Sequence, residues 1–329
     1  MPRHRHSSEE LSFSLFSYGR AGPHRADRFS PSQIAQIART VRGTPEVTVK
    51  VTGGAKSLKA AKAHFSYLSR GEFSIETDQG EQTKGSGSDI LDDWDLDLET
   101  TLAAAPYSRV AGRQPTKLTH HIVLSMPAGT PTKGLLQASR AFARDQFALK
   151  HRYSLVLHTD QPHPHVHLVV KAMSEQGSRL NIRKATLRAW REEFARHLRE
   201  QGIAANATTR TERGVTRKWR LDGIYRAARA GRSQFLQERV KSVAAELRAG
   251  ALKPEPGKAS LLAVRTWVQQ QWREIGAALQ SQGHSDLAAE VARYVQRMPP
   301  VLTDRERVVR GLMQRVRDDR TQSREGPSR

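Results

Sequence analysis

The stretch Tyr153–Lys171 decides the fold, and it reads YSLVLHTDQPHPHVHLVVK. Its two ends, 153–158 and 165–171, are rich in β-branched and aromatic residues, which is typical of strands. The residues between them are few and include two prolines, so they can join the strands as an antiparallel hairpin. We therefore predict two paired strands that meet at a group of histidines.

These histidines are the main candidate for chemistry. Because side chains alternate along a strand, His165 and His167 point to one face, and the hairpin returns His158 beside them. Imidazole nitrogen is a good ligand for divalent transition metals. Three protein ligands leave one coordination position open, as a catalytic metal requires. The competing interpretations are a structural metal and a polar hairpin with incidental histidines.

Two further residues of the hairpin are candidates for supporting roles. Asp160 can orient an imidazole by a hydrogen bond or accept a proton, and the sequence leaves both alternatives open. His163 lies between two prolines and has the same parity as His165, so it is a candidate for a DNA contact or for support of a ligand.

Outward from the hairpin, residues 46–214 mix strand and helix patterns and predict one α+β domain. Further predicted elements are strands at 46–51 and 118–126 and helices at 58–68, 132–149 and 184–201. The acidic stretch 89–99 follows a Gly-Ser segment, and we expect a mobile loop there. Gly53–Ser57 lacks the spacing of a phosphate-binding loop, which argues against nucleotide binding by such a loop.

The two ends of the chain have different patterns. Residues 1–45 are polar and form an N-terminal extension that we expect to be partly flexible, with one short helix at 32–41. Residues 215–329 are helical only, and we predict a basic DNA- or partner-binding region with a disordered tail. Its expected helices are 233–249, 259–279, 285–297 and 303–317.

Composition limits the function classes. The 329 residues carry a formal net charge of +21 that is spread over both halves, so a polyanion such as nucleic acid is the expected partner. The chain has no cysteine, which excludes disulfides and thiolate metal sites. We find no apolar run of membrane-spanning length and no signal peptide, so we expect no membrane insertion.

Tyr67 is a candidate nucleophile near the end of the predicted helix 58–68. A tyrosine on a helix is most often a core or interface residue. Beside a metal, its hydroxyl can attack a phosphodiester and leave a phosphotyrosine and a free 3′-hydroxyl.

Three motifs in this order resemble the conjugative relaxases, which are His-hydrophobic-His single-strand DNA nucleases of plasmid mobilisation. The similarity is greatest to their P-type branch, which includes the T-DNA border endonuclease, and it covers about 46–214. The motifs are YLSRG at 67–71, LTHHIVLSMPAGT at 118–130 and the histidine segment 158–167.

The resemblance implies a relaxase fold, with a central antiparallel sheet and flanking helices, and assigns roles. Tyr67 corresponds to the nucleophile, and His158, His165 and His167 correspond to ligands of Mg, Mn or Zn. Candidate DNA contacts or supporting residues are Ser125, His163, His121, Arg70, Lys50 and Lys56.

The function implied is nicking of one strand at an origin of transfer through a covalent 5′-phosphotyrosine. The alternatives are a rolling-circle replication initiator and a non-catalytic basic DNA-binding or partition protein. An initiator often needs a second nucleophile, and Tyr107 lies in an unrelated loop context. The resemblance also implies origin DNA, accessory relaxosome proteins and a secretion coupling protein as partners. It implies a bacterial cytoplasmic protein that can travel with the DNA into a recipient.

Overall fold

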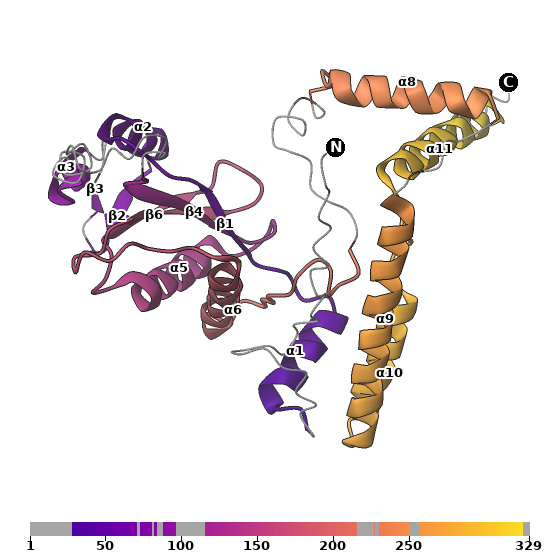
Figure 1. Cartoon of the computed structure of the whole chain (residues 1–329), viewed down its shortest axis with the longest axis horizontal. Coiled ribbons are helices and arrows are strands. Elements are labelled where there is room, and N and C mark those ends of the chain that lie inside the picture. Colours follow the sequence, from indigo (N-terminus) through magenta and orange to yellow (C-terminus); the bar gives the residue numbers. More distant parts are fainter. Residues whose placement is uncertain are drawn as a thin grey trace, which may run out of the picture. The chain divides into compact units, whose positions relative to one another are not determined.

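The structure, a computed structural model, consists of two compact units (Figure 1). One unit comprises residues 43–207, and the other combines residues 208–329 with residues 1–42. Among the described residues, no helix is both long and apolar enough to cross a membrane. The structure describes residues 28–70, 73–80, 82–83, 88–96, 116–215, 227, 230–250, 255 and 257–324.

A six-stranded antiparallel sheet forms the centre of the first unit, in the order β1-β4-β6-β5-β2-β3. The hairpin predicted from the sequence is its β5–β6 pair. The α+β class with an antiparallel sheet, flanking helices and a helical C-terminal region is therefore confirmed. The strands are β1 (Thr48–Gly53), β2 (Ile75–Thr77), β3 (Gln82–Thr83), β4 (Thr119–Ser125), β5 (Tyr153–His158) and β6 (His165–Lys171).

Helices cover both faces of this sheet (Figure 1). Val156 and Val169 belong to the apolar cluster on the side of α2 and α3, whereas Val166 and Leu168 belong to the cluster with α5 and α6. Strand alternation therefore builds two separate cores. The helices are α2 (Leu58–Leu68), α3 (Ser88–Asp93), α5 (Thr132–Phe147) and α6 (Lys184–Glu200).

Helix α2 forms because its first turn is capped and one face is apolar. The Ser57 side chain accepts a hydrogen bond from the Ala60 amide at 3.2 Å, the usual arrangement of a helix N-cap. Ala61, Phe65 and Leu68 follow at helical spacing, and all three are fully buried. This packing fixes the other faces of the helix relative to the sheet.

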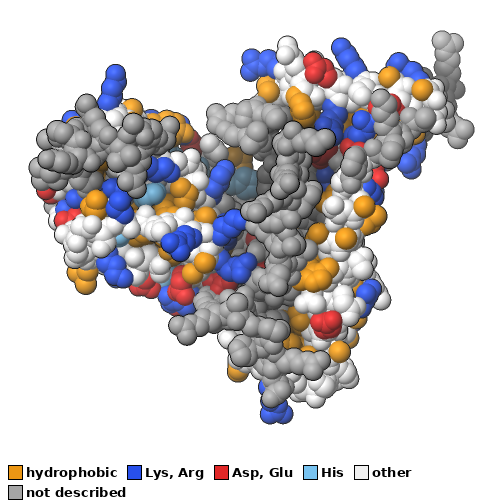
Figure 2. Space-filling model, in the orientation of Figure 1, with side chains coloured by type: hydrophobic (Ala, Val, Ile, Leu, Met, Phe, Trp, Pro, Cys, Tyr) orange, Lys and Arg blue, Asp and Glu red, His pale blue; other side chains and the backbone are white. Residues whose placement is uncertain are grey.

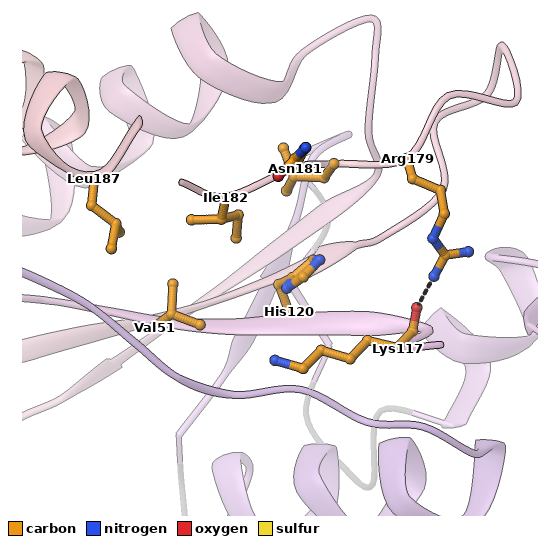
Figure 3. Close-up of a pocket in the computed structure, with 8 residues that line it drawn as sticks. Val51, Lys117, His120, Arg179, Asn181, Ile182 and Leu187 are labelled. Atoms are coloured by element: carbon orange, nitrogen blue, oxygen red, sulfur yellow. Dashed lines mark hydrogen bonds between the residues drawn. The ribbon is translucent and has the colours of Figure 1, made fainter. Parts of the chain in front are cut away.

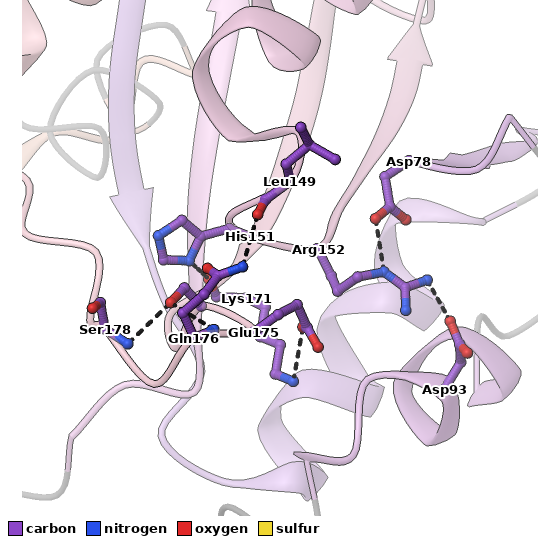
Figure 4. Close-up of polar contacts among 10 residues, drawn as sticks. Asp78, Asp93, Leu149, His151, Arg152, Lys171, Glu175, Gln176 and Ser178 are labelled. Atoms are coloured by element: carbon purple, nitrogen blue, oxygen red, sulfur yellow. Dashed lines mark hydrogen bonds and ion pairs between the residues drawn. The ribbon is translucent and has the colours of Figure 1, made fainter.

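The expected mobile acidic loop at 89–99 is wrong where the structure describes it. Residues 88–93 form α3, and Leu91 and Trp94 are fully buried against the sheet. The Arg152 guanidinium donates to Asp78 at 2.7 Å and to Asp93 at 2.5 Å, so it joins α3 to the sheet (Figure 4). The burial of the apolar residues that lie between the acidic ones therefore decides the local structure, although the acidic side chains repel one another. Residues 97–99 lie outside the described part.

The second unit is helical. Trp272 lies at its centre, fully buried, and the Trp272 indole N–H donates to the Glu212 carbonyl at 2.7 Å. The described part of the expected N-terminal extension includes α1, which packs with α10 in this unit. The expected flexible residues 1–27 and residues 325–329 of the expected disordered tail lie outside the described part. The expectation of disorder is wrong for residues 318–324, which continue the last helix. The helices are α1 (Pro31–Val41), α8 (Gln234–Arg248), α9 (Gly257–Ser281), α10 (Ser285–Gln296) and α11 (Asp304–Arg324).

Substitution of Phe142 tests the assigned core between the sheet and helices α5 and α6. It is fully buried and makes edge contacts with Phe147, Trp190 and Phe194, with ring centroids 5.9–6.3 Å apart. We expect Phe142→Ala to lower the free energy of unfolding by about 3–5 kcal/mol, because it leaves a cavity. Leu149→Ala removes a side chain that is 93% exposed, and we expect a change below about 0.5 kcal/mol. Urea denaturation measures both, and equal effects would contradict the assigned core.

Candidate metal and nucleophile site

The three hairpin histidines converge on one side of the sheet. His158 pairs directly with His165, and Val156 pairs with His167, so strand register brings all three side chains to the same face. One nitrogen from each imidazole lies within 4.8 Å of the other two. His158 is fully buried, and the other two are partly exposed. This is a compact set of donor atoms that faces a partly open surface.

Hydrogen bonds leave two of these imidazoles ready to donate a lone pair. His158 Nε2 lies 2.9 Å from the Leu68 carbonyl oxygen, which can only accept, so Nε2 carries the proton. His158 Nδ1 is then unprotonated, buried and without a hydrogen-bond partner. His165 Nδ1 donates to the His163 carbonyl at 3.1 Å, which frees its Nε2. These unprotonated nitrogens, one of which is buried without a hydrogen-bond partner among the described residues, fit a transition-metal ion.

The bond to Leu68 also brings Tyr67 to the histidines. Leu68 is the last residue of α2, and Tyr67 is its neighbour, with a side chain that is 48% exposed. Tyr67 lies on the exposed face of α2, so its side chain is accessible to a substrate. The structure therefore places the sequence-predicted nucleophile and the histidines at one site.

Arg70 and Asp160 connect the same two segments. The Arg70 guanidinium lies 4.4 Å from the centre of the Tyr67 ring and donates to Asp160 at 2.7 Å. Among the described residues, no hydrogen bond joins Asp160 to an imidazole. Asp160 is thus paired with the guanidinium that lies over the tyrosine ring. Both roles considered for Asp160 from the sequence stay predictions.

The other predicted residues divide into two groups. Ser125 pairs with His165 across β4 and β6, and Lys50 pairs with Val123, so both belong to the face that carries the histidines. Ser125 Oγ donates to the Pro164 carbonyl at 3.2 Å. His163 is exposed on the hairpin turn, and Lys56 is exposed just before α2.

His64 and Phe73 complete the site and were missed from the sequence. His64 stacks on His121 with ring centroids 3.5 Å apart, and Phe73 lies against His158 at 4.4 Å. His64 precedes Tyr67 by three residues, and that helical spacing was the available signal. For Phe73, no local pattern indicated the contact.

Burial sets the electrostatics of the histidines. It lowers the pKa of His167 to about 3, and nearby imidazoles reinforce that shift. Burial likewise lowers the pKa of His121 to about 3 and that of His158. These imidazoles are therefore neutral at physiological pH, which is the form that binds metal.

Residues 70–203 match the family described as "Relaxase: MobA/VirD2-like, nuclease domain". The matched segment is therefore similar to a relaxase nuclease domain. It contains the three histidines and Asp160, and it begins just after Tyr67. The sequence-based identification of the family is confirmed.

Curated proteins that are similar to this chain carry the name "T-DNA border endonuclease VirD2". The protein of Rhizobium radiobacter is 27% identical over 199 residues, which cover 57% of this chain and 45% of the relative. That of Agrobacterium fabrum (strain C58 / ATCC 33970) is 34% identical over 112 residues, or 31% of this chain and 25% of the relative. The chain thus spans less than half the length of the curated relatives it matches.

A solved structure titled "Molecular Basis of Vancomycin Resistance Transfer in Staphylococcus aureus" aligns with a TM-score of 0.32 at 15% identity. The alignment covers 50% of this chain and 99% of that chain.

His120, on the opposite face of β4 from His121, provides a pH prediction. Burial lowers its pKa from 6.5 to about 4, and Lys117 and Arg179 add to the shift. In the unfolded chain the His120 imidazole is protonated below about pH 6.5, whereas in the folded protein it is protonated only below about pH 4. We therefore expect the free energy of unfolding to fall as the pH drops through this window.

The measurement compares urea denaturation at pH 7 and pH 4.5 for the wild type and for His120→Gln. The variant should lose less stability over this interval, because it lacks the titrating imidazole. An identical loss in both proteins would contradict the assignment.

Proposed function

We propose that this chain is a relaxase that nicks one strand at an origin-of-transfer site by tyrosine transesterification. The observation that carries the proposal is the hydrogen bond between His158 and the Leu68 carbonyl, which joins the helix of an exposed tyrosine to three convergent imidazoles. A core tyrosine or an isolated histidine hairpin would not require that proximity. The matched relaxase domain supports the same chemistry.

In the proposed reaction, Tyr67 Oη loses its proton and attacks the scissile phosphorus. A tyrosyl phosphodiester bond forms to the 5′ end, the bond between phosphorus and the 3′ oxygen breaks, and that oxygen takes a proton. Arg70 is positioned by Asp160 beside the tyrosine ring and is available to a phosphate oxygen. Because no water is consumed, the phosphodiester energy is retained and the step is reversible.

His158, His165 and His167 would hold the divalent ion, which polarises the scissile phosphate as a Lewis acid when bound. An all-imidazole set of protein ligands favours Mn or Zn over Mg, which prefers oxygen ligands. Ser125, Lys50 and Lys56 are proposed to contact the DNA backbone, and His121 and His163 are proposed to contact DNA or support the site.

The remaining parts of the proposal concern the setting of the reaction. We propose origin DNA, accessory relaxosome proteins and a secretion coupling protein as partners. We also propose action in the bacterial cytoplasm and transfer with the DNA. The helices of 215–329 are proposed to bind DNA or a partner. A rolling-circle initiator is the alternative within the same chemistry, and its second tyrosine candidate, Tyr107, lies outside the described residues.

Tyr67→Phe tests the nucleophile. The wild-type protein, incubated with a 3′-labelled oligonucleotide from its own origin and Mn²⁺, should give a covalent adduct on a denaturing gel. We expect Tyr67→Phe to give none, because only the attacking oxygen is removed. Tyr153→Phe removes the hydroxyl of a buried tyrosine and serves as the matched control, with adduct retained.

Undiminished adduct with Tyr67→Phe would overturn the nucleophile assignment. Absence of adduct and of nicking in the wild type, across all sequences of its own plasmid, would favour the non-catalytic DNA-binding protein.

His167→Ala tests the metal site. Calorimetric titration with Mn²⁺ or Zn²⁺ should show one site in the wild type, and we expect the variant to lose affinity by about tenfold or more, because one of three protein ligands is missing. His163→Ala removes an exposed neighbouring imidazole outside the triad and should bind like the wild type. Equal affinity of all three proteins would refute the assigned ligands.

A further inference from the structure

A cavity of about 460 Å³ lies within the first unit, where β1, β4, and the segment leading into α6 meet. That volume falls within the roughly 300–1,000 Å³ that is usual for small-ligand sites. Its β4 residue is His120, which neighbours His121 in the strand. Because side chains alternate, the cavity opens on the sheet face opposite the histidine triad. It is therefore distinct from the site described above.

The lining divides into a cationic end and an apolar end (Figure 3). Lys117 and Arg179 lie at one end, and Val51, Ile182 and Leu187 lie at the other. Among the described residues, no Asp or Glu lines the cavity, and neither cation has an ion pair with a carboxylate. A ligand that fits both ends carries a negative group and a flat or apolar group.

Neutral polar groups lie between these ends. His120 Nδ1 is shielded from solvent and has no hydrogen-bond partner, although a buried polar atom normally has one. Asn181 adds an amide, which can donate and accept hydrogen bonds. Polar groups that can donate and accept hydrogen bonds are suited to the edge of a nucleobase.

Contacts with neighbouring segments hold Lys117 in position at the cavity. A Cβ at Gly54 would contact the Thr119 carbonyl and lie 2.7 Å from Lys117 Cδ, so only glycine allows β1 to approach this close. The Lys117 ammonium reaches the Gly53 carbonyl at 3.4 Å, and Arg179 donates to the Lys117 carbonyl. The cationic end is therefore held in place before a ligand arrives.

We propose that this cavity binds one nucleotide of single-stranded DNA away from the nick, with its phosphate at Lys117 and Arg179 and its base against Val51, Ile182 and Leu187. The choice of DNA, and not of a free nucleotide, rests on the proposed function. The cavity adds a contact for the strand on the face of the sheet that the chemistry does not use.

The test measures binding of fluorescein-labelled oligo-dT to the full chain by anisotropy, in the presence of EDTA and at several salt concentrations. We expect Lys117→Gln to weaken binding about tenfold at low salt, because one charged hydrogen bond is lost. Loss of one phosphate contact should also reduce the slope of log K against log salt by about 0.7. Lys133→Gln removes the same charge from an exposed position on α5 and should change neither value.

Asn181→Leu supplies a second variant that keeps the net charge, and it should weaken oligo-dT binding while the thermal unfolding midpoint stays close to that of the wild type. A 5-iodouracil oligonucleotide should crosslink within 117–120 or 179–182.

Equal effects of Lys117→Gln and Lys133→Gln, or crosslinks confined to the triad face, would overturn the proposal. Binding of dTMP that competes poorly with oligo-dT supports a strand contact, and saturable dTMP binding without oligo-dT binding would overturn it.

The two proposals fail separately. If the adduct with Tyr67 never forms but Lys117-dependent oligo-dT binding persists, the proposed function fails and the nucleotide site stands. If the adduct forms and Lys117→Gln binds oligo-dT like the wild type, the nucleotide site fails and the function stands.

Discussion

The hydrogen bond from His158 Nε2 to the Leu68 carbonyl is the contact on which the candidate site depends. It joins residues that are 90 positions apart in the chain. The same bond fixes the tautomer of His158, so that Nδ1 keeps its lone pair. A single contact therefore both positions the helix end that carries Tyr67 and leaves an imidazole nitrogen that could bind a metal. Because His158 is fully buried, water does not compete for that bond.

Sequence patterns predicted the elements that have a strong period and a clear boundary. The strands at 153–158 and 165–171 and the helix at 58–68 occur at those positions, because alternation and helical spacing reflect which side chains are buried. Strands β2 and β3 are too short to show a period. Helix α3 was missed because its acidic residues obscured Leu91 and Trp94, whose burial decides the local structure.

The candidate site was predictable only in part. The parity of His165 and His167 follows from strand geometry alone. That Tyr67 lies beside them came from the resemblance between motifs, because nothing local connects a helix end to a distant hairpin. The Arg70–Asp160 pair and the His64–His121 stack depend on tertiary packing between α2 and the sheet, which no spacing in the sequence encodes.

The net charge of +21 and the chemistry of the site have separate physical roles. Lysine and arginine side chains occur on both units (Figure 2), where they can neutralise backbone phosphates in a salt-dependent manner with little regard to sequence. The triad face instead combines imidazoles with a tyrosine, and the Arg70 guanidinium beside that tyrosine is already held by Asp160. A site of this kind gains less from long-range attraction than from correct placement of its groups.

Two consecutive histidines of β4 separate the two sites. His121 faces α2 and the nucleophile, whereas His120 faces the cavity that Lys117 and Arg179 border. Because side chains alternate along a strand, neighbouring residues point to opposite faces of the sheet. One short segment of β4 therefore contributes a side chain to the triad face and another to the cavity. The sheet between them has continuous hydrogen bonding from β1 through β6, and it resists distortion. A DNA strand gripped on the cavity side would therefore be held at a fixed separation from Tyr67, and this separation would limit which phosphodiester can reach the tyrosine.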